Sequence, residues 1–271
     1  MSKRKQEEES ESERELIDVD FEFFDPIADI DWHGVKRLLT QLFQADALLF
    51  HLNLLTDLIL SQPLVGSTVK CDGRESDPYA FLSVINLNLH ADHPSIESLI
   101  KYFLSKANSN PALRSVLEDA LAPSSNAHVG LILSERLVNM PVQIIPPMYR
   151  MLADEIQWAV EEEEPFNFKY YLVIARTYHL PPEELEDLGQ SSNPSKRRKG
   201  QVTVADTPRF FHPEDEQFEQ VSIHSIHYPF TNAQPREADA FGLDTRGCLI
   251  FIPADRLPHL ISDIQDRYRP S

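Results

Sequence analysis

The stretch Tyr79-Ala80-Phe81-Leu82-Ser83-Val84-Ile85-Asn86-Leu87-Asn88-Leu89 is dominated by aliphatic and aromatic residues. This composition is typical of a β-strand. The turn residues Cys71-Asp72-Gly73 precede it, and residues 65–70 before the turn also have strand character. The sequence therefore predicts two strands, over 65–70 and 79–89, around this turn.

Apolar residues at helical spacing predict two helices before these strands. The first follows Asp31 as its N-cap and ends near Gln44, and Pro63 stops the second. Beyond the strand pair, similar patterns predict helices over 95–106, 111–121, 148–162 and 255–268, and strands over 129–133, 169–179, 221–228 and 247–252. Residues 16–24 mix apolar and acidic side chains, which indicates a strand or a segment that docks on a partner.

The order of these elements predicts an α/β (α+β) fold with a mixed central sheet flanked by helices. Residues 16–271 are expected to form a single domain. An acidic tail over 1–15 has too few apolar residues to offset the entropy of ordering, so we expect it to be disordered. A polar segment rich in Pro and Ser, at about 181–200, predicts a mobile loop.

The overall charge excludes one broad class of function. The chain has 271 residues, with 43 acidic and 25 basic side chains and a formal net charge of -18. Twelve of the carboxylates lie in the first 31 residues. Because a phosphate backbone attracts basic surfaces and repels acidic ones, direct nucleic-acid binding is not expected. A basic protein is the partner that this charge favours.

The cysteines and the most apolar stretch indicate a soluble intracellular protein. Cys71 and Cys248 are the only cysteines, too few for a disulfide framework or a four-cysteine zinc site. Polar residues interrupt the apolar stretch 48–60, which is shorter than the roughly 20 residues that a membrane helix needs. We therefore expect no membrane insertion and no secretory segment.

Motifs for cofactor binding and catalysis are missing from the sequence. No two of the eight glycines are separated by a single residue, which excludes every motif that begins Gly-x-Gly. Gly242 and Gly247 have P-loop spacing, but Cys248 and Leu249 replace the required Lys and Ser/Thr. No Gly-x-Ser-x-Gly elbow is present. We expect no enzyme activity, no catalytic residues and no cofactor.

Two pairs of histidines have spacings that invite comparison with metal sites. His224 and His227 form an H-x-x-H motif, but residues three apart on a strand point to opposite faces. His90 and His93 flank Asp92 without a further ligand at suitable spacing. We interpret both pairs as ordinary surface or half-buried histidines, with metal binding as the alternative, and predict no metal.

Two runs of like charge each have two interpretations, a binding function or an ordinary solvated segment. Four glutamates end the predicted helix 148–162, either as a solvated helix end or as an acidic patch that faces a basic client. The basic run in the segment 181–200 is either a charge-balanced loop or a nuclear import signal. The client-binding candidates are Glu7, Glu8, Glu9, Glu161, Glu162, Glu163 and Glu164, and the import candidates are Lys196, Arg197, Arg198 and Lys199.

Several longer strings resemble the BCCIP family of nuclear proteins, most closely its fungal members. They are Val19-Asp20-Phe21-Glu22-Phe23-Phe24-Asp25-Pro26, Trp32-His33-Gly34-Val35-Lys36, Ile85-Asn86-Leu87, Leu131-Ile132-Leu133-Ser134-Glu135-Arg136-Leu137-Val138-Asn139, Pro146-Pro147-Met148-Tyr149 and Phe168-Lys169-Tyr170-Tyr171. The resemblance implies a single domain with a GNAT-type acetyltransferase fold. The loop expected to bind the cofactor pyrophosphate in such enzymes reads Leu137-Val138-Asn139-Met140-Pro141-Val142 here, without a glycine.

The family resemblance also implies a function and partners. It implies a non-enzymatic nuclear chaperone or adaptor that binds a basic ribosomal protein of the large subunit. It further implies nuclear export of client proteins, including a phosphatidylinositol phosphate kinase, with the help of nuclear transport receptors. The expected location is the nucleus, with shuttling to the cytoplasm. A scaffold in cell-cycle or DNA-repair complexes and an acyltransferase are the alternatives.

Overall fold

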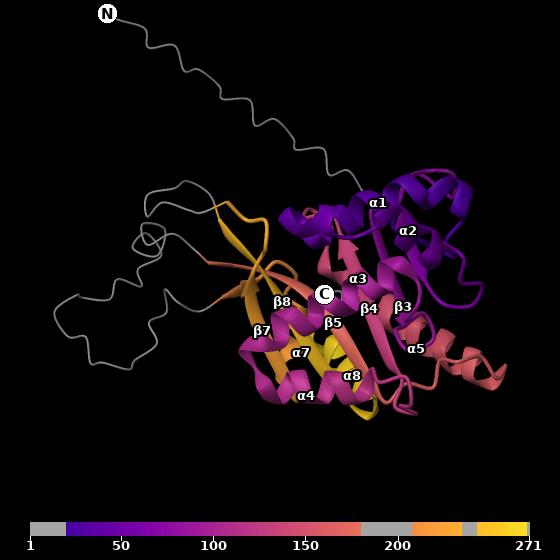
Figure 1. The fold of residues 1–271 in the computed structure, drawn as a ribbon. Coiled ribbons are helices and arrows are strands. Elements are labelled where there is room, and N and C mark those ends of the chain that lie inside the picture. Colours follow the sequence, from indigo (N-terminus) through magenta and orange to yellow (C-terminus); the bar gives the residue numbers. More distant parts are fainter. Residues whose placement is uncertain (1–19, 180–207, 235–242, 270–271) are drawn as a thin grey trace, which may run out of the picture.

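β4 (Val129–Arg136) and β5 (Tyr170–His179) lie at the centre of an eight-stranded mixed sheet (Figure 1). The structure is a computed structural model that describes residues 20–179, 208–234 and 243–269. The strand order is β1-β2-β3-β4-β5-β8-β7, and β6 pairs with β5. The other strands are β1 (Glu22–Phe24), β2 (Ser67–Lys70), β3 (Ala80–Asn86), β6 (Arg209–Phe210), β7 (His224–Pro229) and β8 (Asp244–Pro253).

The pairing of β4 with β5 is the parallel one in the sheet, and the other strand pairs are antiparallel. It joins Val129–Ile132 to residues 170–173 and stops there. Further along β5, Thr177 and Tyr178 pair with β6 instead. The carboxyl halves of β4 and β5 therefore separate, which leaves a place between them for side chains.

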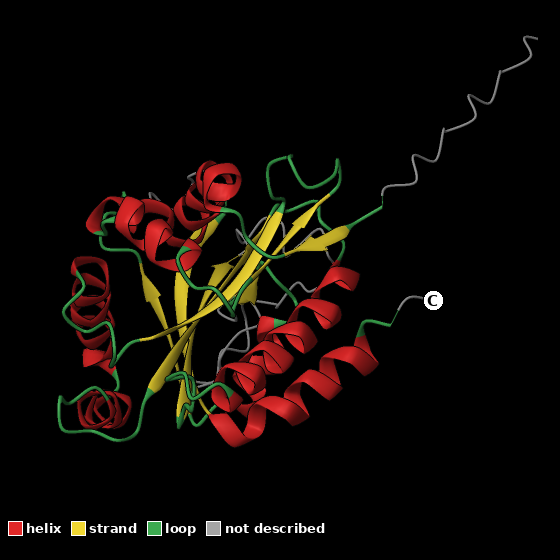
Figure 2. Cartoon of the chain, turned by 90° about the vertical axis from the view of Figure 1, so that its right-hand side faces the viewer, coloured by secondary structure: helices red, strands yellow, loops and turns green. Residues whose placement is uncertain are grey.

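Helices cover both faces of the sheet (Figure 2). One face packs against α1 (Ala28–Phe43), α2 (Leu52–Leu60), α3 (Pro94–Lys106) and α4 (Pro111–Ala120). The other packs against α5 (Ile145–Glu161), α7 (Asp215–Val221) and α8 (Leu257–Arg267). Alternation along β4 serves both cores, because Leu131 and Leu133 point to the first layer and Ile132 to the second.

The predicted fold class, a mixed sheet flanked by helices, is confirmed by this arrangement. The predicted helices and strands each find a counterpart, but the expected strand over 221–228 begins only at His224, and the short α7 before it was not predicted. The predicted tail over 1–15 and the predicted loop at about 181–200 lie outside the described residues.

The prediction that Asp31 is the N-cap of the first helix is wrong. The helix begins at Ala28 after the N-cap Ile27, so that Asp31 lies in its first turn. Its Oδ2 accepts a hydrogen bond of 2.7 Å from the Ile27 amide, and its Oδ1 lies 2.6 Å from the Lys70 Nζ. Both charged side chains are fully buried, so this ion pair, rather than a cap, sets the position of Asp31.

Candidate acidic binding site on helix α5

One face of α5 presents an exposed tryptophan between carboxylates. Asp154 lies four residues before Trp158, and Glu161 and Glu162 follow it by three and four residues. Because side chains three or four positions apart share one side of a helix, these residues form a continuous stripe. Trp158 exposes 61% of its surface, an unusual amount for so large an apolar side chain.

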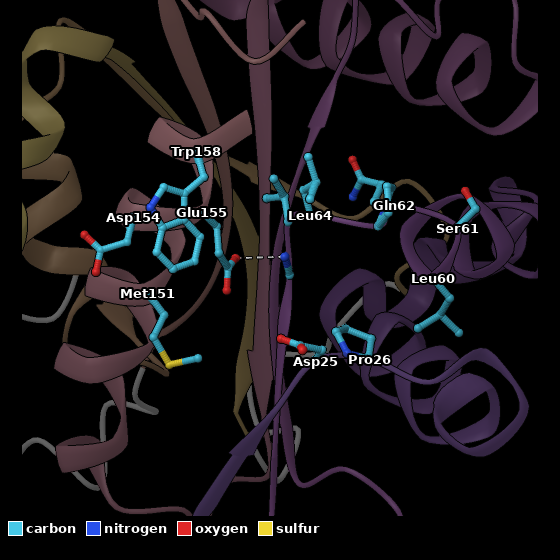
Figure 3. A pocket seen from close by; sticks show the side chains of 13 residues that line it. Asp25, Pro26, Leu60, Ser61, Gln62, Leu64, Met151, Asp154, Glu155 and Trp158 are labelled. Carbon is cyan, nitrogen blue, oxygen red and sulfur yellow. Dashed lines mark hydrogen bonds between the residues drawn. The ribbon is translucent and has the colours of Figure 1, made fainter. Parts of the chain in front are cut away.

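Trp158 and Asp154 also line a pocket of about 440 Å³ between α5 and the segment that leads from α2 into β2 (Figure 3). In Figure 3, Met151, Asp154 and Trp158 lie on the helix side, while Asp25, Pro26 and Gln62 lie opposite. The pocket is lined by Asp25, Pro26, Leu60, Ser61, Gln62, Pro63, Leu64, Val65, Gly66, Met151, Asp154, Glu155 and Trp158. Its volume is in the range that holds a large side chain or a short peptide segment.

Glu155 is the buried acid of this pocket. Its Oε2 accepts a hydrogen bond of 2.9 Å from the Gly66 amide (Figure 3), and its Oε1 accepts one of 3.1 Å from the Ser67 hydroxyl. Burial raises the pKa of Glu155, these two hydrogen bonds lower it, and the charges of Asp25 and Asp154 raise it further, so that the net shift is upward. Three carboxylates at one pocket therefore favour a cationic occupant, which would relieve their repulsion.

The glutamates Glu161–Glu164 close the same helix. The Glu164 amide donates to the Ala159 carbonyl at 2.8 Å, and the Glu163 amide donates to the Val160 carbonyl at 3.1 Å. Glu163 has a φ of 63°. This is a Schellman ending, in which glycine usually takes the left-handed position. A glutamate there is strained, and four negative charges oppose the helix dipole, so stability does not explain this sequence.

Some of the candidate residues predicted from the sequence lie in the described part of the chain, and others do not. Glu161, Glu162, Glu163 and Glu164 are exposed at the end of α5, the helix from which Met151, Asp154, Glu155 and Trp158 line the pocket. Glu7, Glu8 and Glu9 lie outside the described residues, as do Lys196, Arg197, Arg198 and Lys199.

The sequence patterns did not predict four residues of this site, Asp25, Asp154, Glu155 and Trp158. A tryptophan with carboxylates at i−4, i+3 and i+4 on a predicted helix was a signal that could have identified the stripe. The contribution of Asp25 had no such signal, because the residue reaches the pocket only through the pairing of β1 with β2.

The stripe and the pocket together suit a basic, partly apolar ligand. An indole face binds a guanidinium or an ammonium group, and the surrounding carboxylates can pair with it. The exposed Leu64 and the half-buried Met151 add apolar surface for the stem of a long side chain. This chemistry recognises lysine and arginine side chains on a protein.

A second feature, at the point where β4 and β5 separate, is a buried cluster of charges. The guanidinium of Arg176 donates to both carboxylate oxygens of Glu135, at 2.7 and 2.9 Å. His212 also contacts Glu135, and Arg136 pairs with Glu214 beside them. Burial raises the pKa of Glu135, but the hydrogen bond with His212 and the charge of Arg176 outweigh this effect, and the pKa is lowered. The protein's own side chains thus fill a position where parallel strands often leave room for ligands.

The segment after β4 leads into the N-terminus of α5. It passes through a short 3₁₀ turn into α5, whose first turn contains Pro146 and Pro147. Proline has no amide hydrogen, so two donors that could bind a phosphate at this helix N-terminus are missing.

The sequence of the chain is similar to those of known proteins. A family model described as BCCIP matches residues 16–218. The chain belongs to the BCCIP family. Among related sequences, Protein bcp1 of Schizosaccharomyces pombe is 48% identical over 260 residues, which cover 93% of this chain and 90% of that protein. Protein bcp1 of Aspergillus fumigatus is 46% identical over 262 residues, covering 94% and 89%.

A solved structure in the BCCIP family has a similar fold. The crystal structure of BCP1 from Saccharomyces cerevisiae matches with a TM-score of 0.65 and 24% sequence identity, and the match covers 96% of this chain and 93% of that one. The expected likeness to GNAT acetyltransferases stays a prediction.

The names of these BCCIP relatives denote proteins without a stated catalytic activity. Separately, none of the helices within residues 20–179, 208–234 and 243–269 has the length and apolar character that crossing a membrane requires.

Proposed function

We propose that this BCCIP-family protein is a non-enzymatic carrier of basic proteins, and that the α5 stripe with its pocket is the client-binding surface. The observation that carries the proposal is the exposed Trp158, set between Asp154 and Glu161 at the mouth of a pocket that holds two further carboxylates. A fold needs neither an exposed tryptophan nor a glutamate at the left-handed end of a helix.

The client that best fits this surface is a basic ribosomal protein of the large subunit, as the family resemblance implies. Such a protein is rich in lysine and arginine and binds RNA nonspecifically when it is free. A carrier with a net charge of -18 would neutralise it before assembly. The resemblance also supports a nuclear location, shuttling to the cytoplasm, and export of a lipid kinase cargo through nuclear transport receptors.

Charge and apolar contact would have separate roles in binding the client. Carboxylates on α5 and the acidic residues before β1 would attract the client over a distance and speed association. Trp158 and the pocket would then hold one side chain or a short segment and slow dissociation. Client release would follow when RNA, with its denser negative charge, competes for the same basic residues.

Affinity purification of the full chain at low and at high salt, with identification of the bound proteins, tests the proposal. We expect a large-subunit ribosomal protein to be enriched at low salt and to be lost when Trp158, Asp154 and Glu161 are changed together to Ala, Asn and Gln. A control variant changes Leu48, which is 94% exposed in the 3₁₀ segment between α1 and α2, to Ala and should retain the client. Equal recovery of the client by both variants would contradict the assignment of the surface.

A further inference from the structure

Three potential metal ligands converge at the edge of the sheet formed by β7 and β8. They are Glu219 on α7, His227 on β7 and Cys248 on β8. One ligand atom of each lies within 4.8 Å of the other two. The Glu219 Oε1 is 2.8 Å from the His227 Nε2, and the Cys248 Sγ is 3.8 Å from that same nitrogen.

The fold fixes these positions through the register of two strands. His227 lies directly opposite Cys248 in the antiparallel pair of β7 with β8. Directly opposite residues project from the same face of a sheet. The pairing of the two strands therefore brings the side chains of His227 and Cys248 together. His224, three residues away, does not belong to the group. Helix α7 places Glu219 over the pair, where the Ser225 hydroxyl donates to its Oε1 at 2.8 Å.

The arrangement differs from that of a catalytic cysteine. In a Cys-His-carboxylate triad the two partners contact different nitrogens of the imidazole, so that a proton can pass between them. Here both partners approach Nε2, and the buried Nδ1 of His227 has no hydrogen-bond partner among the described residues. Convergence of oxygen, nitrogen and sulfur on one point is instead the geometry of metal coordination.

We propose that Glu219, His227 and Cys248 bind a divalent cation of the Zn²⁺ class. Tetrahedral zinc with ordinary bond lengths separates sulfur from nitrogen by about 3.5 Å, close to the distance found here. The side chains of Glu219 and His227 are 30% and 25% exposed, so the ion can enter from solvent and a water molecule can complete its coordination. The ion would tie α7 to β7 and β8.

Cys248 would have to lose its proton to bind the ion. Burial raises the pKa of Cys248 well above that of a free thiol, and the charge of Glu219 raises it further. Binding a divalent ion would therefore compete with the thiol proton and release it. Because the site offers three protein ligands and leaves Nδ1 of His227 without a partner, we expect weaker binding than in a closed four-ligand site, by about 10–100-fold.

Untagged full-length protein, stripped of metal by a chelator, is titrated with Co²⁺ and Zn²⁺. We expect one ion per chain and a thiolate-to-cobalt charge-transfer absorption. Cys248→Ser should abolish that absorption, while Cys71→Ser, the matched control at the other cysteine, should keep it. Glu219→Gln changes a partly exposed residue and should lower zinc affinity by at least about tenfold.

Three results would contradict the proposed metal site. They are the lack of stoichiometric binding, an absorption that survives in Cys248→Ser or disappears in Cys71→Ser, and a Glu219→Gln variant that binds zinc as tightly as wild type. Circular dichroism checks the fold of each variant. If Cys248→Ser does not fold, His227→Gln and Glu219→Gln decide the question. The result does not bear on client binding, which uses α5.

Discussion

Trp158 lies one helical turn after Asp154 on α5, and both side chains line the same pocket. An aromatic face beside a carboxylate forms a binding site for a lysine or arginine side chain, because the cation interacts with both. An acidic surface alone would attract many cations, whereas Trp158 beside Asp154 would favour one position for a bound cationic side chain.

Truncation of Trp158 tests this centre. Trp158→Ala should weaken client binding by about 2 kcal/mol, or roughly 30-fold, as is typical of an aromatic hot spot. The loss should appear mainly as faster dissociation, measured by surface plasmon resonance with an immobilised client. Leu48→Ala removes an even more exposed apolar side chain elsewhere and should bind as wild type does. Equal effects of the two changes would show that Trp158 has no special role.

The left-handed Glu163 predicts a gain in stability from a single substitution. Glu163→Gly relieves backbone strain and removes a charge that opposes the helix dipole, so the free energy of unfolding should rise by about 1 kcal/mol. The matched control is Glu162→Gly, which removes the same charge at a residue with a φ of -83°. It should give no gain, because glycine has no advantage at that conformation. Urea denaturation of both variants measures the difference, and a larger gain for the control would refute the strain.

The raised pKa of Glu155 predicts a stability effect with a defined sign. Because its folded pKa lies above its unfolded value, the group favours folding most below the unfolded pKa and loses that contribution as the pH rises through the folded pKa. At neutral pH the buried carboxylate is therefore a cost, and Glu155→Gln should raise the melting temperature. The difference from wild type should shrink as the pH falls toward the ordinary glutamate pKa of about 4.3. A variant that is less stable at neutral pH would contradict this explanation.

The basic run Lys196, Arg197, Arg198 and Lys199 predicts a change in location. Replacing all four with Ala should shift a large fluorescent fusion from the nucleus toward the cytoplasm, because an import receptor needs a dense cationic cluster. A second, shorter basic cluster, Lys3-Arg4-Lys5, precedes the acidic tail residues, and its replacement with Ala serves as the comparison. If the fusion moves to the cytoplasm only when Lys3, Arg4 and Lys5 are replaced, the run at 196–199 is not the import signal.

Local sequence patterns predicted most of the helices and strands but could not predict which of them meet. The strand composition around Val84 and the charge run at Glu161–Glu164 are local properties, so both were visible in the sequence. The contact of Glu155 with the Gly66 amide joins residues that are 89 positions apart, and only the folded sheet brings them together. The same holds for His227 and Cys248, whose proximity depends on the register of β7 with β8.

The short α7 was missed for a related reason. Its sequence offers one buried apolar anchor, Phe218, and no repeating helical pattern. Asp31 was misplaced because an aspartate before an apolar run is typical of an N-cap, whereas here it is held by Lys70 from a distant strand. Tertiary contacts overrode local preference at both positions.

The rate of client association at two ionic strengths tests the central claim most directly. Glu161, Glu162, Glu163 and Glu164 are changed together to Gln, and in a separate variant residues 1–15 are deleted. The control removes four exposed charges from the opposite layer of helices by changing Asp92, Glu97, Glu118 and Asp119 to the matching amides. Melting temperatures are measured in parallel.

We predict slower association at low salt and a flatter salt dependence for the α5 variant, a smaller change of the same kind for the tail deletion, and little change for the control. Stability should be unchanged or slightly higher in the α5 variant, because its charges oppose the helix dipole. If the α5 variant and the tail deletion both bind the client as fast as wild type at low salt, the acidic surface on α5 is not where the client binds.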